Sequence, residues 1–333
     1  MNNTDYTSIT GYLRVLEKRL LQTDGIERVI DAPNAIDAAK ALSQSSEYDF
    51  SALVKPEDYE LVLSSELKKT YKSLYNLAPD KTVMDIILAK YDYHNLKTAL
   101  KSKYLGKNDA LLYVDYTLTP PEYIQEAVIS GAKPEKLPEH LAQAIVFAEA
   151  AYLAGENPQN IDIALDTHMF GHLSEQAKLC ENDFIAEYVK LLIDFYNVKL
   201  MLRAKNMDKD LKFLKNALCD GGKINPQDLI SNFEKEPAAL ADAFHYKYFG
   251  TIMKTAVENF EKTGNFSSLE KLFDNCLIEH VKKSKYISFG PEVLLSYIFS
   301  KENEARQIRI IMTCKINNIR PEVLRERLRD NYA

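Results

Sequence analysis

Tyr91–Lys103 of the chain reads YDYHNLKTALKSK, and two later stretches of equal length repeat its pattern. They are IDFYNVKLMLRAK over Ile193–Lys205 and NEARQIRIIMTCK over Asn303–Lys315. Each copy has an acid, an amide three residues later, an aliphatic residue and a base directly after the amide, and a lysine eight residues after the amide. In the order acid, amide and lysine, the copies hold Asp92, Asn95 and Lys103; Asp194, Asn197 and Lys205; and Glu304, Gln307 and Lys315. This spacing predicts three helices that each carry these residues on one face, as three copies of one structural unit would.

Other landmarks recur with the same rhythm. A proline that opens a helical pattern follows each copy, and proline suits the first helical position because its missing amide has no partner there. These prolines are Pro121, Pro226 and Pro321. The sequence PEHLAQAI from Pro138 matches PAALADAF from Pro237, and IDIALD from Ile161 resembles LEKLFD from Leu269.

Segments rich in proline and charge separate the copies. They fall at GAKPEKLP, which ends at Pro138, and at EKEP, which ends at Pro237. We therefore expect three helical repeats over residues 1–133, 134–236 and 237–333. The fold class that we predict is all-α. The alternations YDFSALV from Tyr48 and LLYVDYTL from Leu111 are read as helix ends or loops, and a short strand is an alternative for the second.

Composition excludes several classes of protein. A net charge of −6 argues against a general nucleic-acid binder, which needs a concentrated basic surface. The four cysteines contain no CxxC pair and are interpreted as small buried hydrophobes in a reducing compartment. The N-terminus has no pattern of a signal peptide, and the most apolar window, from Leu141, is too short and too polar to span a bilayer. Any membrane association is thus expected to run through partner proteins.

Motifs for catalysis are scarce. The sequence contains neither a GxxxxGK[ST] loop nor a GxGxxG motif, so direct nucleotide hydrolysis is not expected. His168 and His172 are four residues apart, which could place two imidazoles on one helical face as in a zinc site. Met169 stands where a zinc protease would have its glutamate, so we interpret the pair as a surface or interface feature.

The repeated polar stripe has two interpretations. It could bind a ligand or a partner, or its amides Asn95, Asn197 and Gln307 could satisfy backbone groups where helices cross, with each acid pairing with the base five residues later on its own helix. We favour the structural interpretation because a catalytic site seldom needs three copies in one chain. The arginine-rich tail RPEVLRERLR from Arg320 is likewise read as a solvated helical face, with contact to acidic partner loops as the alternative.

The three signature helices, with GYLRVLEKRLL near the N-terminus and NIRPEVLRERL near the C-terminus, resemble the C subunit of the bacterial and archaeal V-type (A/V-type) ATPases, the counterpart of the d subunit of the eukaryotic V-ATPase. The resemblance covers essentially the whole chain. Its most specific motifs are KYDYHNLKTALKSKY and FSKENEARQIRIIMTCK. In the second motif, Gln307 and Thr313 stand where the other copies have asparagine and a base, which affects only how well the third copy matches the others.

This resemblance implies an all-helical funnel of three subdomains with pseudo-threefold symmetry. It implies a noncatalytic socket in the central rotor, on the cytoplasmic face of the membrane, between the axle with its small companion subunit and the proteolipid ring. Rotation would then drive proton or sodium transport. No catalytic residue, cofactor or metal site is expected. The alternatives are an unrelated helical-repeat adaptor and a metalloenzyme built on His168 and His172.

Overall fold

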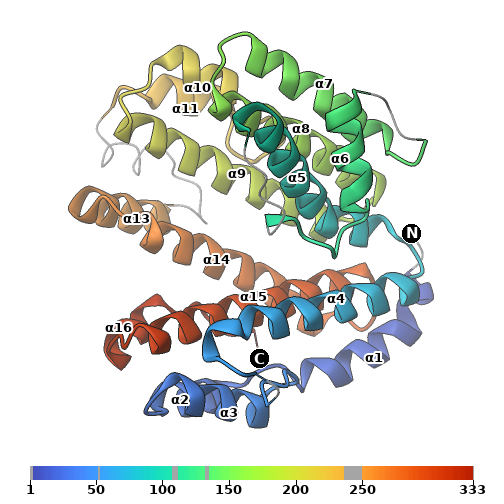
Figure 1. Ribbon diagram of the computed structural model, residues 1–333, viewed down its shortest axis with the longest axis vertical. Coiled ribbons are helices and arrows are strands. Elements are labelled where there is room, and N and C mark those ends of the chain that lie inside the picture. Colours follow the sequence, from blue (N-terminus) through green and yellow to red (C-terminus); the bar gives the residue numbers. More distant parts are fainter. Residues whose placement is uncertain (1–2, 52, 107–111, 132–134, 236–249, 333) are drawn as a thin grey trace. The chain divides into compact units, whose positions relative to one another are not determined.

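The computed structural model describes residues 3–51, 53–106, 112–131, 135–235 and 250–332, and every regular element in these ranges is a helix (Figure 1). The all-α prediction is confirmed for this part of the chain. The alternation from Leu111 forms no strand over its described residues 112–118. None of the described helices is both long enough and apolar enough to cross a bilayer.

The chain divides into two compact units. Unit 1 combines residues 1–79 with residues 235–333, and unit 2 consists of residues 80–234. The predicted repeat boundaries at 133/134 and 236/237 lie outside the described residues. The division into three repeats therefore stays a prediction.

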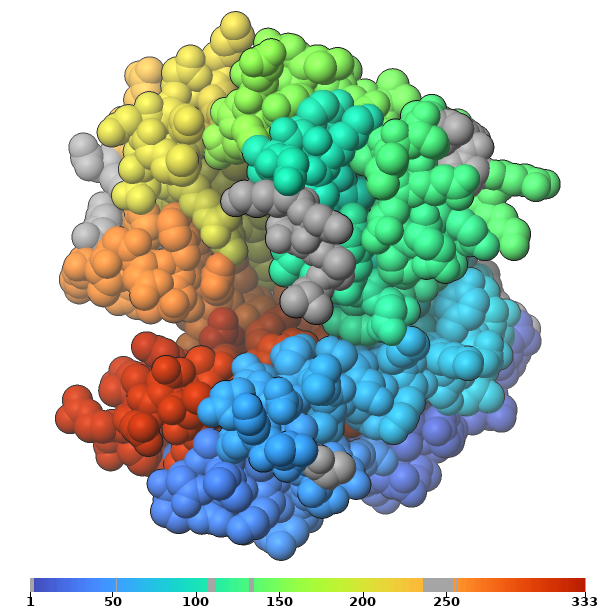
Figure 2. Space-filling view, in the orientation of Figure 1, coloured from blue at the N-terminus to red at the C-terminus, as the bar shows by residue number. Residues whose placement is uncertain are grey.

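Unit 1 is organised around one long helix. Its elements are η1 (Asn3–Tyr6), α1 (Thr7–Glu17), α2 (Thr23–Asp31), α3 (Ala35–Ser45), η2 (Pro56–Asp58), α4 (Tyr59–Leu77), α13 (Gly250–Thr263), α14 (Ser267–Lys282), η4 (Lys283–Tyr286), α15 (Pro291–Ile316) and α16 (Pro321–Arg327). Helices α1, α3, α4, α14 and α16 all pack against α15. The N-terminal helices α2 and α3, blue in Figures 1 and 2, thus lie beside the red C-terminal helices.

Helix α15 is buried around its whole circumference over its first half. Every residue from 291 to 305 is buried, including Lys301, Glu302 and Glu304. A helix surrounded on all sides shows no amphipathic period. The stretch SKENEARQ within α15, over residues 300–307, is so polar that its sequence suggests a solvent-exposed segment, yet α15 forms the centre of unit 1.

Unit 2 is built on α5 and α8, which pack against each other and enclose an apolar core with α6 and α7. Its elements are α5 (Thr82–Leu105), α6 (Pro121–Ser130), α7 (Glu139–Leu153), α8 (Pro158–Leu179), α9 (Asp183–Asn206), α10 (Leu211–Ala217) and α11 (Pro226–Asn232).

The predicted helix starts are confirmed at the prolines, since Pro121, Pro226 and Pro321 are the first residues of α6, α11 and α16. Asparagine side chains cap other helices. Asn182, for example, accepts a hydrogen bond from the amide of Ile185 at the start of α9. The three signature stretches lie in the helices α5, α9 and α15.

Candidate functional site

The polar stripe of the first copy binds the backbone of the segment that returns after α5. The Oδ1 atom of Asp92 accepts hydrogen bonds from the amides of Leu118 and Thr119, both at 3.1 Å, and Oδ2 accepts one from the Thr119 hydroxyl. The Asn95 side chain both donates to the carbonyl of Val114 and accepts from its amide, at 2.8 and 2.9 Å.

Lys103 completes the set, because its Nζ atom donates to the carbonyl of Val128 at 2.9 Å. The acid, the amide and the lysine therefore hold three successive points of one segment. We call these contacts of the acid, amide and lysine with the backbone the backbone clamp.

The second copy has the same clamp. Asp194 accepts hydrogen bonds from the amides of Lys223 and Ile224, at 3.1 and 2.9 Å. Asn197 makes two bonds of 2.8 Å with the amide and carbonyl of Cys219, and Lys205 donates to the carbonyl of Phe233. For these two copies the prediction that the asparagine satisfies backbone groups is confirmed.

The third clamp closes on the opposite end of the chain. Glu304 accepts a hydrogen bond of 2.6 Å from the amide of Leu21, and Lys315 donates to the carbonyls of Ile30 and Ala32. Gln307 differs from the two asparagines, because its Oε1 atom is buried without a hydrogen-bond partner in the described part of the chain.

The acid and the lysine bind backbone groups at the same positions relative to the start of the clamped helix in all three copies. The amide bound by the acid lies two residues before the first residue of the helix, and the carbonyl bound by the lysine lies seven residues after it. The clamped helices are α6 with Thr119 and Val128, α11 with Ile224 and Phe233, and α2 with Leu21 and Ile30. Helix α2 is thus the counterpart of α6 and α11, so the third copy is completed by the N-terminal segment.

This arrangement changes the interpretation of Pro321. It opens a helix as predicted, but α16 is not held by the clamp of the third copy. The clamped element α2 begins instead with Thr23 and has no proline. Reading the sequence in chain order pairs Pro321 with Pro121 and Pro226, and the structure corrects that pairing.

The predicted pairing of each acid with the base five residues later is wrong in the first and third copies. Lys97 bonds to Asp166 of α8, and Arg309 forms a bidentate pair with Glu60 of α4 at 2.8 and 2.6 Å. The acids bind backbone amides, and the bases tie the signature helix to a neighbouring helix.

Burial sets the protonation behaviour of the clamp acids. Asp92 and Asp194 are fully buried, and loss of hydration raises the pKa of Asp92 to about 7 and that of Asp194 to about 6, although their backbone hydrogen bonds act in the opposite direction. Burial also raises the pKa of Glu304, against the lowering effect of Lys301.

Gly222 gives a direct test of how tightly the second clamp fits. A Cβ atom at this position would lie 2.1 Å from Oδ1 of Asp194, so the clamped segment would have to move. We expect Gly222→Ala to lower the free energy of unfolding of unit 2 by about 1–3 kcal/mol. Urea denaturation measures this.

The matched control is Gly171→Ala in α8, where an added Cβ meets no atom within 4 Å. Alanine there should raise the stability by about 0.5–1 kcal/mol, because it favours the helix. Equal stabilities of the Gly222→Ala variant and the wild type would show that the segment yields without cost.

His168 and His172 belong to a histidine cluster at the junction of α5, α7 and α8. The ring of His172 stacks on that of His140, with centroids 4.0 Å apart and planes within 8°. His168 Nδ1 shares a hydrogen bond of 2.8 Å with the hydroxyl of Tyr93. The parallel stacked rings of His140 and His172 cannot both point a lone pair at one ion. No group of three or more His, Cys, Asp or Glu side chains in the described residues has a metal-binding arrangement.

Burial lowers the pKa of all three histidines, that of His140 to about 4. The cluster is therefore neutral at pH 7 and packs as a set of aromatic rings. Sequence spacing brings out the pair on α8 but gives no sign of His140, which lies 28 residues earlier on another helix.

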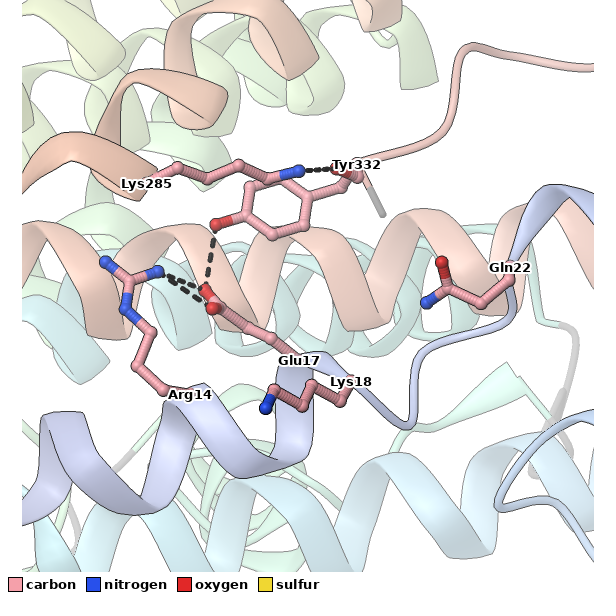
Figure 3. Close-up of a pocket in the computed structure, with 6 residues that line it drawn as sticks. All are labelled: Arg14, Glu17, Lys18, Gln22, Lys285 and Tyr332. Carbon is pink, nitrogen blue, oxygen red and sulfur yellow. Dashed lines mark hydrogen bonds and ion pairs between the residues drawn. The ribbon is translucent and has the colours of Figure 1, made fainter.

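A polar pocket of about 380 Å³ in unit 1 lies where the N-terminal helix meets the last residues (Figure 3). The Nη1 atom of Arg14 donates to both carboxylate oxygens of Glu17, and its Nη2 atom donates to the carbonyls of Ser284 and Ile287. The Tyr332 hydroxyl donates to Glu17 at 2.8 Å. These groups form hydrogen bonds with one another, and the bonds join α1 to η4 and to the C-terminal segment.

Comparisons with known proteins agree over nearly the whole chain. A family model described as ATP synthase (C/AC39) subunit matches residues 9–327. The C subunit of the V-type sodium ATPase of Enterococcus hirae is 25% identical over 337 residues, which cover 98% of this chain and 99% of that protein.

Archaeal proteins are similarly related. The C subunit of the A-type ATP synthase of Methanocaldococcus jannaschii is 23% identical over 347 residues, covering 97% of this chain and 86% of that protein. The protein of the same description from Pyrococcus furiosus is 24% identical over 353 residues, covering 97% of this chain and 90% of that protein.

Proposed function

The chain belongs to the ATP synthase (C/AC39) subunit family, and we propose that it is a noncatalytic coupling subunit of a rotary ATPase. In this proposal it joins the rotating axle and its small companion subunit to the membrane-embedded proteolipid ring. ATP hydrolysis in the head then turns axle, coupling subunit and ring together, and the ring moves protons or sodium ions.

The observation that carries this proposal is the full-length correspondence with the Enterococcus hirae protein, in which almost no residue of either chain is left outside the matched region. Its name identifies that relative as part of a sodium ATPase. The ion used here would be set by carboxylates of the ring, which is another chain.

The backbone clamps suit a part that transmits torque. Each clamp fixes a short helix to a long one through two or three groups that are far apart along the helix, and two of the clamp acids are fully buried. Such contacts resist sliding, because a shift of one residue would leave several buried donors unpaired. Three clamped units arranged as a funnel with pseudo-threefold symmetry would present a wide, stiff socket.

Reconstitution tests the proposed function. Membranes that contain the proteolipid ring are combined with the head and axle complex, with and without this chain. We expect ATP-driven ion uptake to require the chain, while ATP hydrolysis by the isolated head continues without it. Uptake that is equally fast without the chain, or ATP hydrolysis by the purified chain, would refute the proposal.

Polar contacts would let the protein assemble with the axle and ring and separate from them again. Charged side chains on exposed loops would make these contacts, so binding should weaken as ionic strength rises. Sedimentation of the chain with the axle complex over a range of salt concentrations measures this, and binding that is independent of salt would contradict it.

A further inference from the structure

The short helices α10 and α16 follow the second and third signature helices, α9 and α15, through turns of the same geometry. After α9 the chain turns at Asp208, with φ +50°, and after α15 it turns at Asn318, with φ +52°. The amide that follows each of these residues bonds to a carbonyl five residues earlier, at 2.9 Å in both cases. Helices α10 and α16 are each seven residues long and start three residues after the turn. They are therefore counterparts.

The helices α8 and α14 are also counterparts, because IDIALD in α8 resembles LEKLFD in α14. A groove lies beside each pair. In unit 2 a groove of about 290 Å³ lies between α7, α8 and α10, and in unit 1 one of about 590 Å³ lies between α14, α15 and α16. In Figure 2 the surface is recessed between the orange α13 and α14 and the red α16. Four pairs of matched residues line the two grooves: Ile163 and Lys271, Phe213 and Val323, Asn216 and Glu326, and Ala217 and Arg327.

The two grooves differ in charge. No charged side chain lines the groove of unit 2 among the described residues. Four cations and one carboxylate line the groove of unit 1, which we call the basic groove: Lys271, Arg309, Arg327, Arg329 and Glu326. In unit 2 the counterparts of Lys271 and Arg327 are Ile163 and Ala217, and α8 still packs on α10, so the contact between these two helices does not require the two cations. They are also unexpected from composition, because the chain has a net charge of −6.

The cations of the basic groove are not all engaged equally. Arg329 pairs with Asp274 at 2.9 Å, and Lys271 donates to the carbonyl of Glu326 at 2.7 Å. The exposed guanidinium of Arg327 has no hydrogen bond or ion pair within the part of the chain that the structure describes. Arg327 therefore keeps its fork of donors available for a ligand.

We propose that the basic groove docks an acidic segment of a partner protein. The guanidinium fork binds carboxylates in a bidentate manner, and a groove of about 590 Å³ accommodates several side chains and not merely a single ion. A bilayer surface favours an exposed basic face over a recess between helices. This proposal rests on the proposed function in one respect, namely that the partner is another subunit of the rotary assembly.

Titration of the full-length chain with a fluorescein-labelled octaglutamate peptide tests the groove without the motor. We expect saturable binding that weakens on raising NaCl from about 50 to about 300 mM. The double variant Lys271→Glu, Arg327→Glu should weaken it on the order of tenfold or more, and the neutral variant Lys271→Gln, Arg327→Gln by less. Circular dichroism checks that both variants are folded.

The matched control is Lys212→Glu, Lys215→Glu on α10, the counterpart of α16. Both lysines are exposed, and the change in net charge is the same. This control should retain binding. Equal loss in the two charge-reversed variants would mean that only net charge matters and would overturn the proposal, as would unchanged binding in the Lys271→Glu, Arg327→Glu variant.

Vesicles of phosphatidylcholine with phosphatidylglycerol distinguish the other source of anions. If the vesicles displaced the peptide from the wild-type chain and did not bind the Lys271→Glu, Arg327→Glu variant, the groove would be a lipid-binding surface and the proposal would be overturned. Because the titration uses neither axle nor ring, its failure leaves the reconstitution experiment untouched, and a failed reconstitution leaves the titration valid.

Discussion

Replacing Lys301 with methionine is expected to lower the free energy of unfolding of unit 1 by about 3–5 kcal/mol. Lys301 is only 1% exposed, and its Nζ atom lies 2.9 Å from Glu304, 3.6 Å from Glu47 and 4.3 Å from the centroid of the Tyr48 ring. Methionine fills a similar volume but leaves the buried carboxylate of Glu304 without its nearest cation. The cost is that of an uncompensated buried charge.

A double variant separates the ion pair from packing. Glutamine at position 304 still offers an oxygen to the amide of Leu21, so Lys301→Met, Glu304→Gln should regain most of the stability lost in Lys301→Met. The surface pair of Lys282 and Glu279 is the control, and Lys282→Met should cost less than about 1 kcal/mol. Urea denaturation gives the energies, and hydrogen exchange at Leu21 and along α15 assigns them to unit 1.

The pH dependence provides a second readout. Burial raises the pKa of Glu304, and removal of Lys301 should raise it further. At low pH the carboxyl of the Lys301→Met variant takes up a proton and is neutral, so the defect should shrink as pH falls. A variant that is no less stable than the Lys282→Met control, at any pH, would mean that Glu304 needs no cation.

The sequence predicts the helices themselves well, because their signals are local. Proline at the first helical position and the three copies of the signature mark α6, α11, α16 and the three long helices in the right places. The common face of acid, amide and lysine follows from helical geometry alone, and in the first two copies its asparagine binds backbone as expected.

The partner of the third signature could not be predicted, because it comes from the other end of the chain. Leu21 precedes Glu304 by 283 residues, and its helix starts at Thr23, which lacks the proline that marks α6 and α11. A local pattern carries no information about closure over such a distance. The same limit hides His140, whose stacking on His172 depends on how α7 packs on α8.

Charged residues are the other source of error. In a helix, lysine and glutamate usually face water, so Lys301 and Glu304 give no sign in the sequence that they are buried. The prediction of a solvated face holds for Arg320, Arg325 and Arg327, which are exposed, and the pairs of Arg325 with Glu27 and Asp31 lie at the surface. Arg329 departs from it, because it is half-buried and pairs with Asp274. The other interpretation of the tail, contact with acidic partner loops, agrees with the partner that we propose for the basic groove, because Arg327 and Arg329 line that groove.

The second large effect is expected at Asp92. This carboxylate accepts hydrogen bonds from the amides of Leu118 and Thr119 and from the Thr119 hydroxyl, in a fully buried position. Asp92→Ala leaves these donors without an acceptor, each at a cost of about 1–3 kcal/mol, so unit 2 should lose roughly 3–5 kcal/mol in total. Urea denaturation at pH 7 measures the loss. A loss below about 1 kcal/mol would mean that the first clamp contributes little.

Asp92→Asn separates the charge from the hydrogen bonds. The folded-state pKa of Asp92 is raised to about 7 from an ordinary value of 3.8, so between these values the native chain holds a proton that the unfolded chain has released. Wild-type stability from this group therefore falls as pH rises through that window, while asparagine cannot ionise. Relative to wild type, Asp92→Asn should gain on the order of 2–4 kcal/mol between pH 4 and pH 8.

The second clamp supplies an independent check of the same effect. Asp194→Asn should show the same sign over the narrower window that ends near pH 6, because the pKa of Asp194 is raised less than that of Asp92. The opposing titration of His140 cancels in each difference, because that residue is unchanged in both variants. Parallel stability curves for wild type and both variants would show that the clamp acids are ionised in the fold as they are in water.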